Sequence, residues 1–410
     1  MSLKQIIVAG GGAAGFFAAI ACAEASPDVR VTLLEKGARF LEKVRISGGG
    51  RCNVTHACFD PREFAQRYPR GGRALLSPFQ KFSARDTVEW FSARGVKLKT
   101  EGDGRMFPVT DNSQTIMDCL TNAAQRAGVM LRTRCGVEQA TKRAGGGFEL
   151  VLTDGETAEC DALLLATGGC RAAAAGHLAV SLGHALEAPV PSLFTFQIEV
   201  PWLRSLAGVA VDAEVSVPVA KLRERGPVLV THWGLSGPAV LRLSAWGARA
   251  LHDLDYQFPL FVNWLPEWNA EKIAAELNAR RQSQPAKLVV NAPVPPLSSR
   301  LWEQLVLAAG IAPETKWTMF SRANAHALTQ QLARSEFPVN GKSTNKDEFV
   351  TCGGVKLAEV DFKTMQSRIT PGLFFAGELL DIDGITGGFN FQAAWTTGWI
   401  AGRAMAGLAG

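Results

Sequence analysis

KQIIVAGGGAAGFFAAIACAEASPDVRVTLLEK, residues 4–36, is the stretch of sequence that decides the fold. Its first six residues, Lys4–Ala9, form a short apolar run of the kind that is buried in a parallel sheet. An alanine-rich helical stretch, Phe16–Ala25, and a second apolar strand, Val29–Leu34, follow. This order predicts a β-α-β unit with its two strands parallel.

The turn between the first strand and the helix carries glycines in the spacing GxGxxG, at Gly10, Gly12 and Gly15. Gly10 permits a tight turn, Gly12 allows a phosphate to approach the backbone, and Gly15 allows the helix to pack closely on the strand. The helix N-terminus would offer free N–H groups and its positive dipole end to a pyrophosphate, and Ala13 and Ala14 in the turn are assigned to the cofactor site. The stretch therefore predicts a Rossmann-like dinucleotide-binding unit.

The residue at the end of the second strand discriminates among dinucleotides. Glu35 lies 20 residues after Gly15, where a carboxylate accepts hydrogen bonds from the adenosine ribose hydroxyls. Lys36 follows it and is also assigned to the cofactor site. A carboxylate at this position disfavours a ribose 2′-phosphate, so the sequence favours FAD or NAD over NADP.

A second glycine cluster, Arg45–Asn53, favours FAD over NAD. A simple NAD dehydrogenase has no need of a second glycine-rich loop at this place. The backbone N–H groups and side-chain donors of the loop would line an extended FAD between its pyrophosphate and its flavin. A surface hairpin is the alternative interpretation. The residues assigned to the cofactor here are Ser47, Gly48, Gly49, Gly50, Arg51, Cys52 and Asn53.

Two segments in the middle of the chain are predicted to pass the same cofactor. The apolar run Ala162–Ala166 ends in Thr167 and Gly168, which we assign to the FAD site. Upstream, Val129–Val137 is predicted to be a strand, and Val137 at its end would meet the adenine edge.

The C-terminal part of the chain is predicted to return to this site. Gly372–Glu378 reads as a strand that ends at a glycine and an acid. This segment resembles the Gly-Asp of flavoproteins whose carboxylate binds the ribityl chain, and the resemblance implies that Gly377 contacts the FAD and that Glu378 or Asp381 takes the ribityl role.

The loop that follows, Gly384–Gln392, leads into a predicted last helix, Ala393–Met405. Its N-terminus would face the flavin pyrimidine ring and stabilise the negative charge of reduced flavin. Gly388 is expected to contact the flavin through its backbone, so that a substitution by valine should act mildly, on the flavin potential. The residues assigned to the flavin here are Gly388, Phe389, Asn390 and Phe391.

Taken together, these segments resemble the bacterial FAD-binding flavoproteins grouped around aminoacetone oxidase, to which BaiN-type enone reductases are also similar. The most specific parts of the resemblance are Ile46–Thr55, Gly104–Pro108, Thr231–Ala239 and Gly353–Gly402. The family implies a glutathione-reductase-like FAD domain interrupted by a β-rich substrate domain with a helical part. Members of the family commonly carry Asn at the position of His56 and Tyr at the position of Phe389, and the segment Cys170–His177 also departs from their pattern.

We therefore expect an α/β protein whose Rossmann-like FAD-binding domain, with a parallel sheet, is discontinuous in sequence. It is predicted to comprise residues 1–188 and 353–410. Short strands such as Val209–Val219 and Pro227–His232 predict a β-rich inserted substrate domain, residues 189–265 and 335–352, in the form of a small barrel or sandwich. Apolar spacing of three and four predicts a helical subdomain over residues 266–334, with helices at Asn269–Arg281, Leu297–Ala309 and Ser321–Ala333.

Two side chains are candidates for catalysis, each with a structural alternative. His232, in a turn-rich segment after a strand, could move a proton near neutral pH or simply bond to backbone. Arg105 could bind an anionic substrate group or be an exposed structural arginine. Cys52 could be a redox thiol, although no second cysteine stands in CxxC spacing. The sequence contains a single GxGxxG, so either the reduced flavin is reoxidised by oxygen or a nicotinamide, NAD(P)H, visits the flavin transiently.

Composition narrows the classes of partner. The net charge is +5 and the Lys and Arg residues are scattered, which an enzyme of anionic cofactors explains as well as nucleic acid does, and no nucleic-acid partner is expected. Eight cysteines without CxxC and six histidines without HxxxH predict neither a metal site nor a disulfide framework. No long uncharged apolar run or leader is evident, so a cytoplasmic enzyme of a small-molecule substrate is expected. A flavin-dependent RNA-modifying enzyme and a non-catalytic flavin redox sensor are the alternatives, and no motif encodes the substrate or the oligomeric state.

We expect the FAD to be held without a covalent link, because the sequence shows no evident His or Cys attachment motif. Acid precipitation of the yellow protein should release all of the flavin into the supernatant, where chromatography should identify FAD. Colour that stays in the pellet, or FMN in the supernatant, would contradict this expectation.

Overall fold

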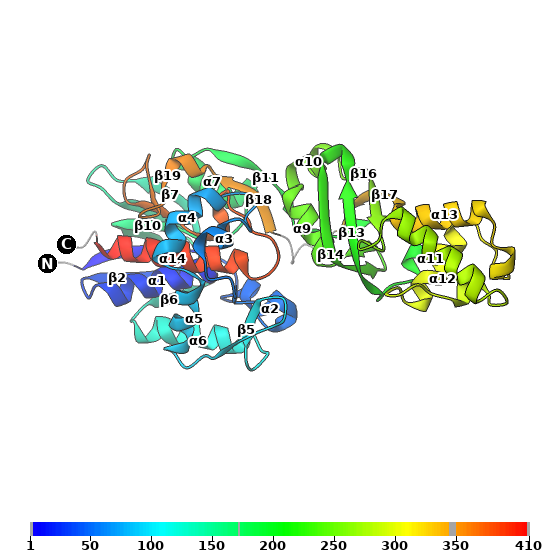
Figure 1. The fold of residues 1–410 in the computed structure, drawn as a ribbon. Coiled ribbons are helices and arrows are strands. Elements are labelled where there is room, and N and C mark those ends of the chain that lie inside the picture. Colours follow the sequence, from blue (N-terminus) through cyan, green and yellow to red (C-terminus); the bar gives the residue numbers. More distant parts are fainter. Residues whose placement is uncertain (1–2, 171–172, 344–349, 408–410) are drawn as a thin grey trace. The chain divides into compact units, whose positions relative to one another are not determined.

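The computed structural model describes residues 3–170, 173–343 and 350–407, and the chain divides into two compact units (Figure 1). The first unit is Met1–Pro191 with Asp347–Gly410, and the second is Ser192–Lys346. Each unit has its own sheets and its own buried core, and each is described by itself.

A seven-stranded sheet forms the centre of the first unit, in the order β19-β20-β21-β10-β1-β2-β6. Five of its strands are parallel, and β19 and β20 pair antiparallel at one edge. Ala9 stands opposite both Leu34 and Leu165, and Leu165 stands opposite Phe375, so four parallel strands end side by side. The bounds are β1 (Lys4–Ala9), β2 (Val29–Glu35), β6 (Met130–Thr133), β10 (Ala162–Leu165), β19 (Val360–Asp361), β20 (Gln366–Ser367) and β21 (Leu373–Phe375).

The first and last helices of the unit, α1 (Ala13–Ala25) and α14 (Phe389–Gly407), pack on one another (Figure 1, blue and red). Their backbones approach so closely that a Cβ atom on Gly398 would lie 2.4 Å from the Ala14 carbonyl oxygen. Gly402 meets the Ala18 carbonyl oxygen one turn later, at 2.3 Å. The remaining helices are α2 (Glu42–Gly50), α3 (Pro61–Ala65), α4 (Gly72–Lys81), α5 (Ala84–Ser92), α6 (Gln114–Arg126) and α7 (Ala173–Ser181).

Three smaller sheets complete the first unit. They are β3 (Thr55–His56) with β5 (Arg105–Pro108) and β4 (Leu98–Thr100); β7 (Val137–Lys142) with β8 (Phe148–Leu152) and β9 (Thr157–Cys160); and β11 (Leu186–Ser192) with β18 (Val350–Val355). The prediction of a single strand over Val129–Val137 is wrong, because β6 ends at Thr133. Arg134 then adopts a left-handed φ of 54°, which turns the chain out of the central sheet. Val137 instead begins β7.

The second unit is a closed six-stranded barrel with helices attached. Along β13 the side chains of Ala213, Val215 and Val217 are buried and alternate with less buried ones, as expected for a strand with one face inside a barrel. The barrel strands are β12 (Phe196–Gln197), β13 (Ala210–Val217), β14 (Leu222–Thr231), β15 (Gly234–Ser236), β16 (Gln257–Asn263) and β17 (Ser335–Lys342).

The three helices predicted for the middle of the chain are present, within a few residues of the expected bounds. They are α11 (Ala270–Ser283), α12 (Ser299–Ala308) and α13 (Arg322–Ala333), and Trp302 and Trp317 are fully buried in this part of the unit. Three shorter helices, α8 (Pro201–Arg204), α9 (Pro238–Trp246) and α10 (Ala248–Asp253), also belong to the second unit. Among the described helices of both units, none is long and apolar enough to cross a membrane.

The packing of α14 on α1 should be sensitive to one methyl group. Gly398→Ala places a Cβ atom 2.4 Å from a backbone oxygen, so we expect the free energy of unfolding to fall by about 1–3 kcal/mol. Gly407→Ala on the same helix is the matched control, because no atom lies within 4 Å of its Cβ position. Denaturant unfolding measures the free energy of unfolding of both variants. Equal values would contradict the prediction, because they would show that α14 can move away from α1 without loss of stability.

Candidate functional site

Four loops meet where the parallel strands of the first unit end. They follow β1, β2, β10 and β21, and begin at Gly10, Lys36, Ala166 and Ala376. Ligands of open α/β sheets bind outside the carboxyl ends of such strands. Segments from the start, the middle and the end of the chain therefore build one region.

The glycine turn after β1 has the geometry of an anion cradle. A Cβ atom on Gly10 would lie 2.3 Å from the Ala166 carbonyl oxygen, and one on Gly15 would lie 1.9 Å from the Gly10 carbonyl oxygen, so both positions exclude side chains. Gly12 is different, because no atom lies within 4 Å of its Cβ position. Gly12 is also the N-cap of α1 and provides no side-chain cap, so the backbone N–H groups of Ala13 and Ala14 have no protein acceptor among the described residues. This open, uncapped helix N-terminus fits a pyrophosphate.

The carboxylate of Glu35 is held beside this turn. Its Oε2 accepts a hydrogen bond from the Gly11 N–H at 2.9 Å, and its Oε1 accepts one from the Gly37 N–H at 2.6 Å. A carboxylate has about four acceptor sites, so two remain for the ribose hydroxyls. The fixed orientation of Glu35 and the open space at Gly12 both fit the adenosine diphosphate part of FAD.

The segment around Val137 borders Glu35 through its backbone. The Cys135 N–H donates to the Glu35 carbonyl oxygen at 2.9 Å, and Gly136 packs on exposed Lys36, whose Cβ lies 2.8 Å from the position a Cβ would take. Val137, half-buried, is the next residue. Lys36 and Val137 thus lie on neighbouring segments beside Glu35.

The second glycine cluster leaves the helical conformation within α2. Gly48, Gly49 and Gly50 have φ values of 58°, 67° and 83°, and no atom lies within 4 Å of the Cβ positions of Gly49 and Gly50. The loop is open on this side, as a cofactor-binding loop must be. Ser47, which precedes it, donates through its hydroxyl to the Val44 carbonyl oxygen at 3.0 Å.

Cys52, next in this segment, points into the protein, whereas Arg51 is half-buried. The Cys52 side chain is fully buried, and burial raises its pKa to about 12, which argues against the redox thiol that was one interpretation of the sequence. The Arg51 guanidinium pairs with Glu101 at 2.6 Å and lies over the Phe107 ring at 4.0 Å.

The loop before α14 is joined to this segment by Asn53. With its amide oriented to satisfy both ends, Asn53 accepts from the Gly388 N–H at 3.0 Å and donates to the Thr55 carbonyl oxygen at 3.1 Å. Gly388 has a φ of 93°, and a Cβ atom on it would lie 2.6 Å from that same oxygen. The expectation that Gly388→Val would be mild is therefore wrong, because the substitution would displace backbone.

The last helix begins at Phe389, four residues earlier than expected from the sequence. Phe389 is buried and stacks on His56, with ring centroids 4.7 Å apart. Asn390 closes the preceding loop, since its amide exchanges hydrogen bonds with Gly384 at 2.8 and 2.9 Å. Phe391 is half-buried and stacks on Trp395.

The turn after β21 brings the C-terminal segment onto α1. Gly377 has a φ of 72°, and a Cβ atom on it would lie 2.9 Å from the Ala14 Cβ. Glu378 forms an ion pair with Lys43 and accepts from the Thr351 N–H at 2.9 Å. After β10, Thr167 is exposed and the Cβ position of Gly168 is open.

The two candidate catalytic residues lie in different units. Arg105 belongs to β5 of the first unit, where its guanidinium pairs with Glu101 at 3.0 Å and Asp103 at 2.7 Å. His232 lies in the turn between β14 and β15 of the second unit, and both it and the neighbouring Trp233 are exposed. Of the segment Cys170–His177, in which the sequence departs from the family, residues 171–172 lie outside the described residues.

The sequence did not single out His56 as a functional residue, although it lies three residues after the second glycine cluster. Its Nδ1 lies 3.1 Å from the Gly387 carbonyl oxygen, in the loop before α14. Burial lowers the pKa of His56, so its imidazole is neutral near pH 7. His56 therefore links the second glycine segment, Gly104 behind it and the loop before α14.

Comparisons with known proteins find relatives that match nearly the whole chain. The family model described as HI0933-like protein Rossmann domain matches residues 4–404. The 3-dehydro-bile acid delta(4,6)-reductase of Clostridium scindens is 29% identical over an alignment of 413 positions, which covers 98% of this chain and 99% of that protein. The ribosomal RNA dihydrouridine synthase of Escherichia coli is 31% identical over 410 residues, with 97% of each chain covered.

A solved structure shows the same fold at low identity. The 3-ketosteroid-delta4-(5alpha)-dehydrogenase from Rhodococcus jostii is 15% identical, with a TM-score of 0.54 and with 99% of this chain and 97% of that chain covered.

A substitution at Gly12 can test cofactor binding without disturbing the fold, because the Cβ position of Gly12 is open. Gly12→Val meets no protein atom and has an extended backbone, so we expect a folded but colourless protein, because the side chain would stand where phosphate oxygens accept hydrogen bonds of about 1.5–3 kcal/mol each. The matched control is Gly145→Val, another open glycine with no positive φ, which should stay yellow. The ratio of flavin to protein absorbance measures occupancy, and full occupancy in Gly12→Val would place the cofactor elsewhere.

Proposed function

Because the chain belongs to the HI0933-like Rossmann-domain family of FAD-binding oxidoreductases, the group around aminoacetone oxidase and the BaiN-type reductases, we propose that it reduces a carbon–carbon double bond conjugated with a carbonyl group. The observation that carries this proposal is the uncapped N-terminus of α1 beside the fixed Glu35 carboxylate, in a chain related over its whole length to two such reductases.

The names of the two relatives describe the same chemical step. A delta(4,6)-reductase of a 3-dehydro steroid saturates double bonds conjugated with the C3 ketone, and a dihydrouridine synthase saturates the uracil double bond conjugated with a ring carbonyl. In both, a hydride adds to the double-bond carbon that lies farther from the carbonyl along the conjugated chain, and a proton adds to the nearer carbon. We propose that step for this chain.

Bound FAD would supply the hydride from its N5 atom, and the residues of this chain would position and surround it. The N–H groups of Ala13 and Ala14 would hold the pyrophosphate, and Glu35 the ribose. The loop before α14, fixed by Asn53, would direct the helix N-terminus to the flavin ring and favour its anionic reduced form. The FAD is proposed to be bound non-covalently.

The proton needs an acid near the substrate. His232, exposed on the second unit, remains the proposed donor, because an imidazole can act as a general acid near neutral pH. Arg105 remains a candidate for binding an anionic substrate group, but it would first have to exchange its ion pairs with Glu101 and Asp103.

A reductase needs an external source of electrons. The sequence holds a single GxGxxG, so we propose that NAD(P)H visits the flavin transiently rather than binding in a domain of its own. A nicotinamide would transfer one hydride to the flavin, and the flavin would transfer one hydride to the substrate, which balances two electrons in each half-reaction. Oxidation of a substrate, with oxygen reoxidising the flavin, is the competing direction.

A uracil base in RNA is a second candidate substrate, because one relative is a ribosomal RNA dihydrouridine synthase. The distribution of charge favours it: residues 192–346 hold 16 Lys and Arg against 12 Asp and Glu, which is +4 of the total of +5. An excess of cations on the inserted unit is what phosphate-backbone binding requires. The chemistry at the flavin would be unchanged.

Anaerobic spectroscopy tests the proposal. We expect NADH or NADPH to bleach the FAD absorbance, and an added enone, or a uridine-containing RNA, to restore it while one double bond is saturated per flavin. Gly12→Val, without FAD, is the control for a flavin-independent reaction. Reoxidation by RNA but not by small enones would select the second candidate, and reduction of the flavin by an amine or alcohol substrate in place of NAD(P)H would overturn the proposed direction.

A further inference from the structure

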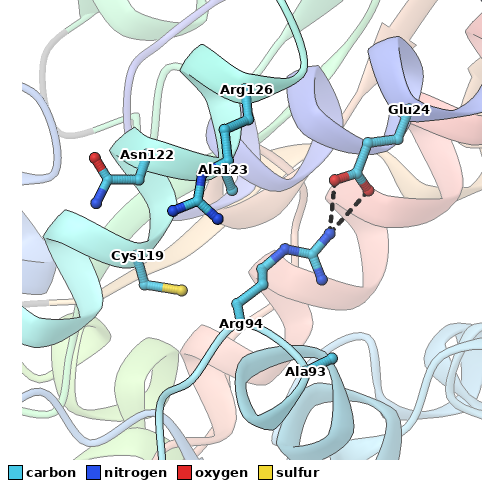
Figure 2. A pocket seen from close by; sticks show the side chains of 7 residues that line it. All are labelled: Glu24, Ala93, Arg94, Cys119, Asn122, Ala123 and Arg126. Carbon is cyan, nitrogen blue, oxygen red and sulfur yellow. Dashed lines mark hydrogen bonds and ion pairs between the residues drawn. The ribbon is translucent and has the colours of Figure 1, made fainter.

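A pocket of about 370 Å³ lies between α1, α5 and α6, on the first unit (Figure 2). It is lined by Glu24, Ala93, Arg94, Cys119, Asn122, Ala123 and Arg126. Glu24 stands in the last turn of α1, at the opposite end of that helix from the pyrophosphate cradle at Gly12. A helix of 13 residues is about 20 Å long, so this pocket is separate from the cofactor site.

One arginine of the pocket is already paired. Nη2 of Arg94 donates to both carboxylate oxygens of Glu24, at 2.6 and 2.9 Å. Its guanidinium carbon also lies over the Trp90 ring, 3.8 Å from the ring centroid, and Nη1 donates to the Trp90 carbonyl oxygen at 3.3 Å. The Arg94 side chain is thus oriented at the pocket wall with its charge matched by Glu24.

The other arginine has no acidic partner. Arg126 is exposed in the last turn of α6, and no ion pair to it exists within the described residues. Figure 2 shows its side chain extending past Ala123 toward the part of the pocket where Cys119 and Asn122 lie. The pocket therefore holds two guanidinium groups and one carboxylate, an excess of one positive charge.

The pKa of the Cys119 thiol is influenced by both arginines, so both guanidinium groups lie near the same part of the pocket. Burial raises the pKa of the Cys119 thiol to about 11, while the charges of Arg94 and Arg126 act in the opposite direction. The thiol is therefore neutral at pH 7 and adds no negative charge. Both guanidinium groups are close enough to this one sulfur atom to influence it.

We propose that this pocket binds a small dianion, a phosphate ester or a dicarboxylate. Arg126 would provide the first charge-assisted hydrogen bonds, and Arg94 the second set as the ligand competes with Glu24. The Asn122 amide adds a neutral donor, and Ala93 and Ala123 give apolar walls for the carbon skeleton. The volume admits a molecule of metabolite size and excludes a dinucleotide.

Binding should have an optical signal, because Arg94 stacks on Trp90. Trp90 in turn lies 4.5 Å from Phe17, and Phe17 lies 4.7 Å from Trp395 of α14. A ligand that draws Arg94 away from Glu24 changes the contact with the Trp90 ring and hence its fluorescence. Trp90→Phe should lose this change while keeping the binding.

The test uses the full-length protein saturated with FAD, so that the pyrophosphate cradle is filled. Calorimetric titration with inorganic phosphate, and separately with succinate, should show one saturable site at low ionic strength. Arg126→Gln and Arg94→Gln should each weaken the affinity roughly tenfold. Arg73→Gln is the matched control, since Arg73 is an exposed arginine on α4 outside the pocket, and it should leave the affinity unchanged.

The two ligands separate phosphate from carboxylate selectivity within the proposed class. Absence of saturable binding of both ligands up to concentrations of about 10 mM, well above ordinary metabolite affinities, would overturn the proposal. Equal affinity in the wild type and in Arg126→Gln would also overturn it, because the binding would then take place at another site.

Discussion

The close approach of backbone segments around the start of α1 is the constraint on which the first unit depends. Gly10, Gly15 and Gly398 each stand where a Cβ atom would come within 2.4 Å of a carbonyl oxygen. Three elements converge there through these glycines: β10 beside the turn, α1 after it and α14 across it. Since van der Waals contact begins near 3.5 Å, larger residues at these positions would push the elements apart and open the cradle.

This convergence makes the cofactor site a property of the whole chain rather than of one segment. Gly12 belongs to the first turn of the fold and Gly377 to the last strand connection, and the residues between them include the entire second unit. The first unit cannot complete its helix pair until α14 has been made. A ligand that contacts both ends binds only the folded state, so FAD is expected to stabilise this unit by mass action.

The sequence predicted what local spacing encodes and missed what tertiary partners decide. The strand, glycine turn and helix around Gly12 could be predicted because the apolar run, the glycine spacing and the helical stretch all lie within one short segment of sequence. Gly388 was predicted only as a glycine near the flavin, since its contact with Thr55, 333 positions away, leaves no pattern in the chain. Arg105 was considered for substrate binding because its partner Glu101 could not be recognised before β4 and β5 were paired. For the same reason, the sequence did not decide whether the inserted strands form a closed barrel or a sandwich.

The distribution of charge between the units gives the basic composition a different meaning from the one that the sequence suggested. The first unit, which contains the anion cradle, holds 27 Lys and Arg against 26 Asp and Glu and is nearly neutral. Its uncapped helix N-terminus offers the dipoles of Ala13 and Ala14 instead of side-chain cations. An anionic cofactor therefore does not explain the excess of positive charge. That excess belongs to the inserted unit, where it can act on a substrate without affecting how the cofactor is held.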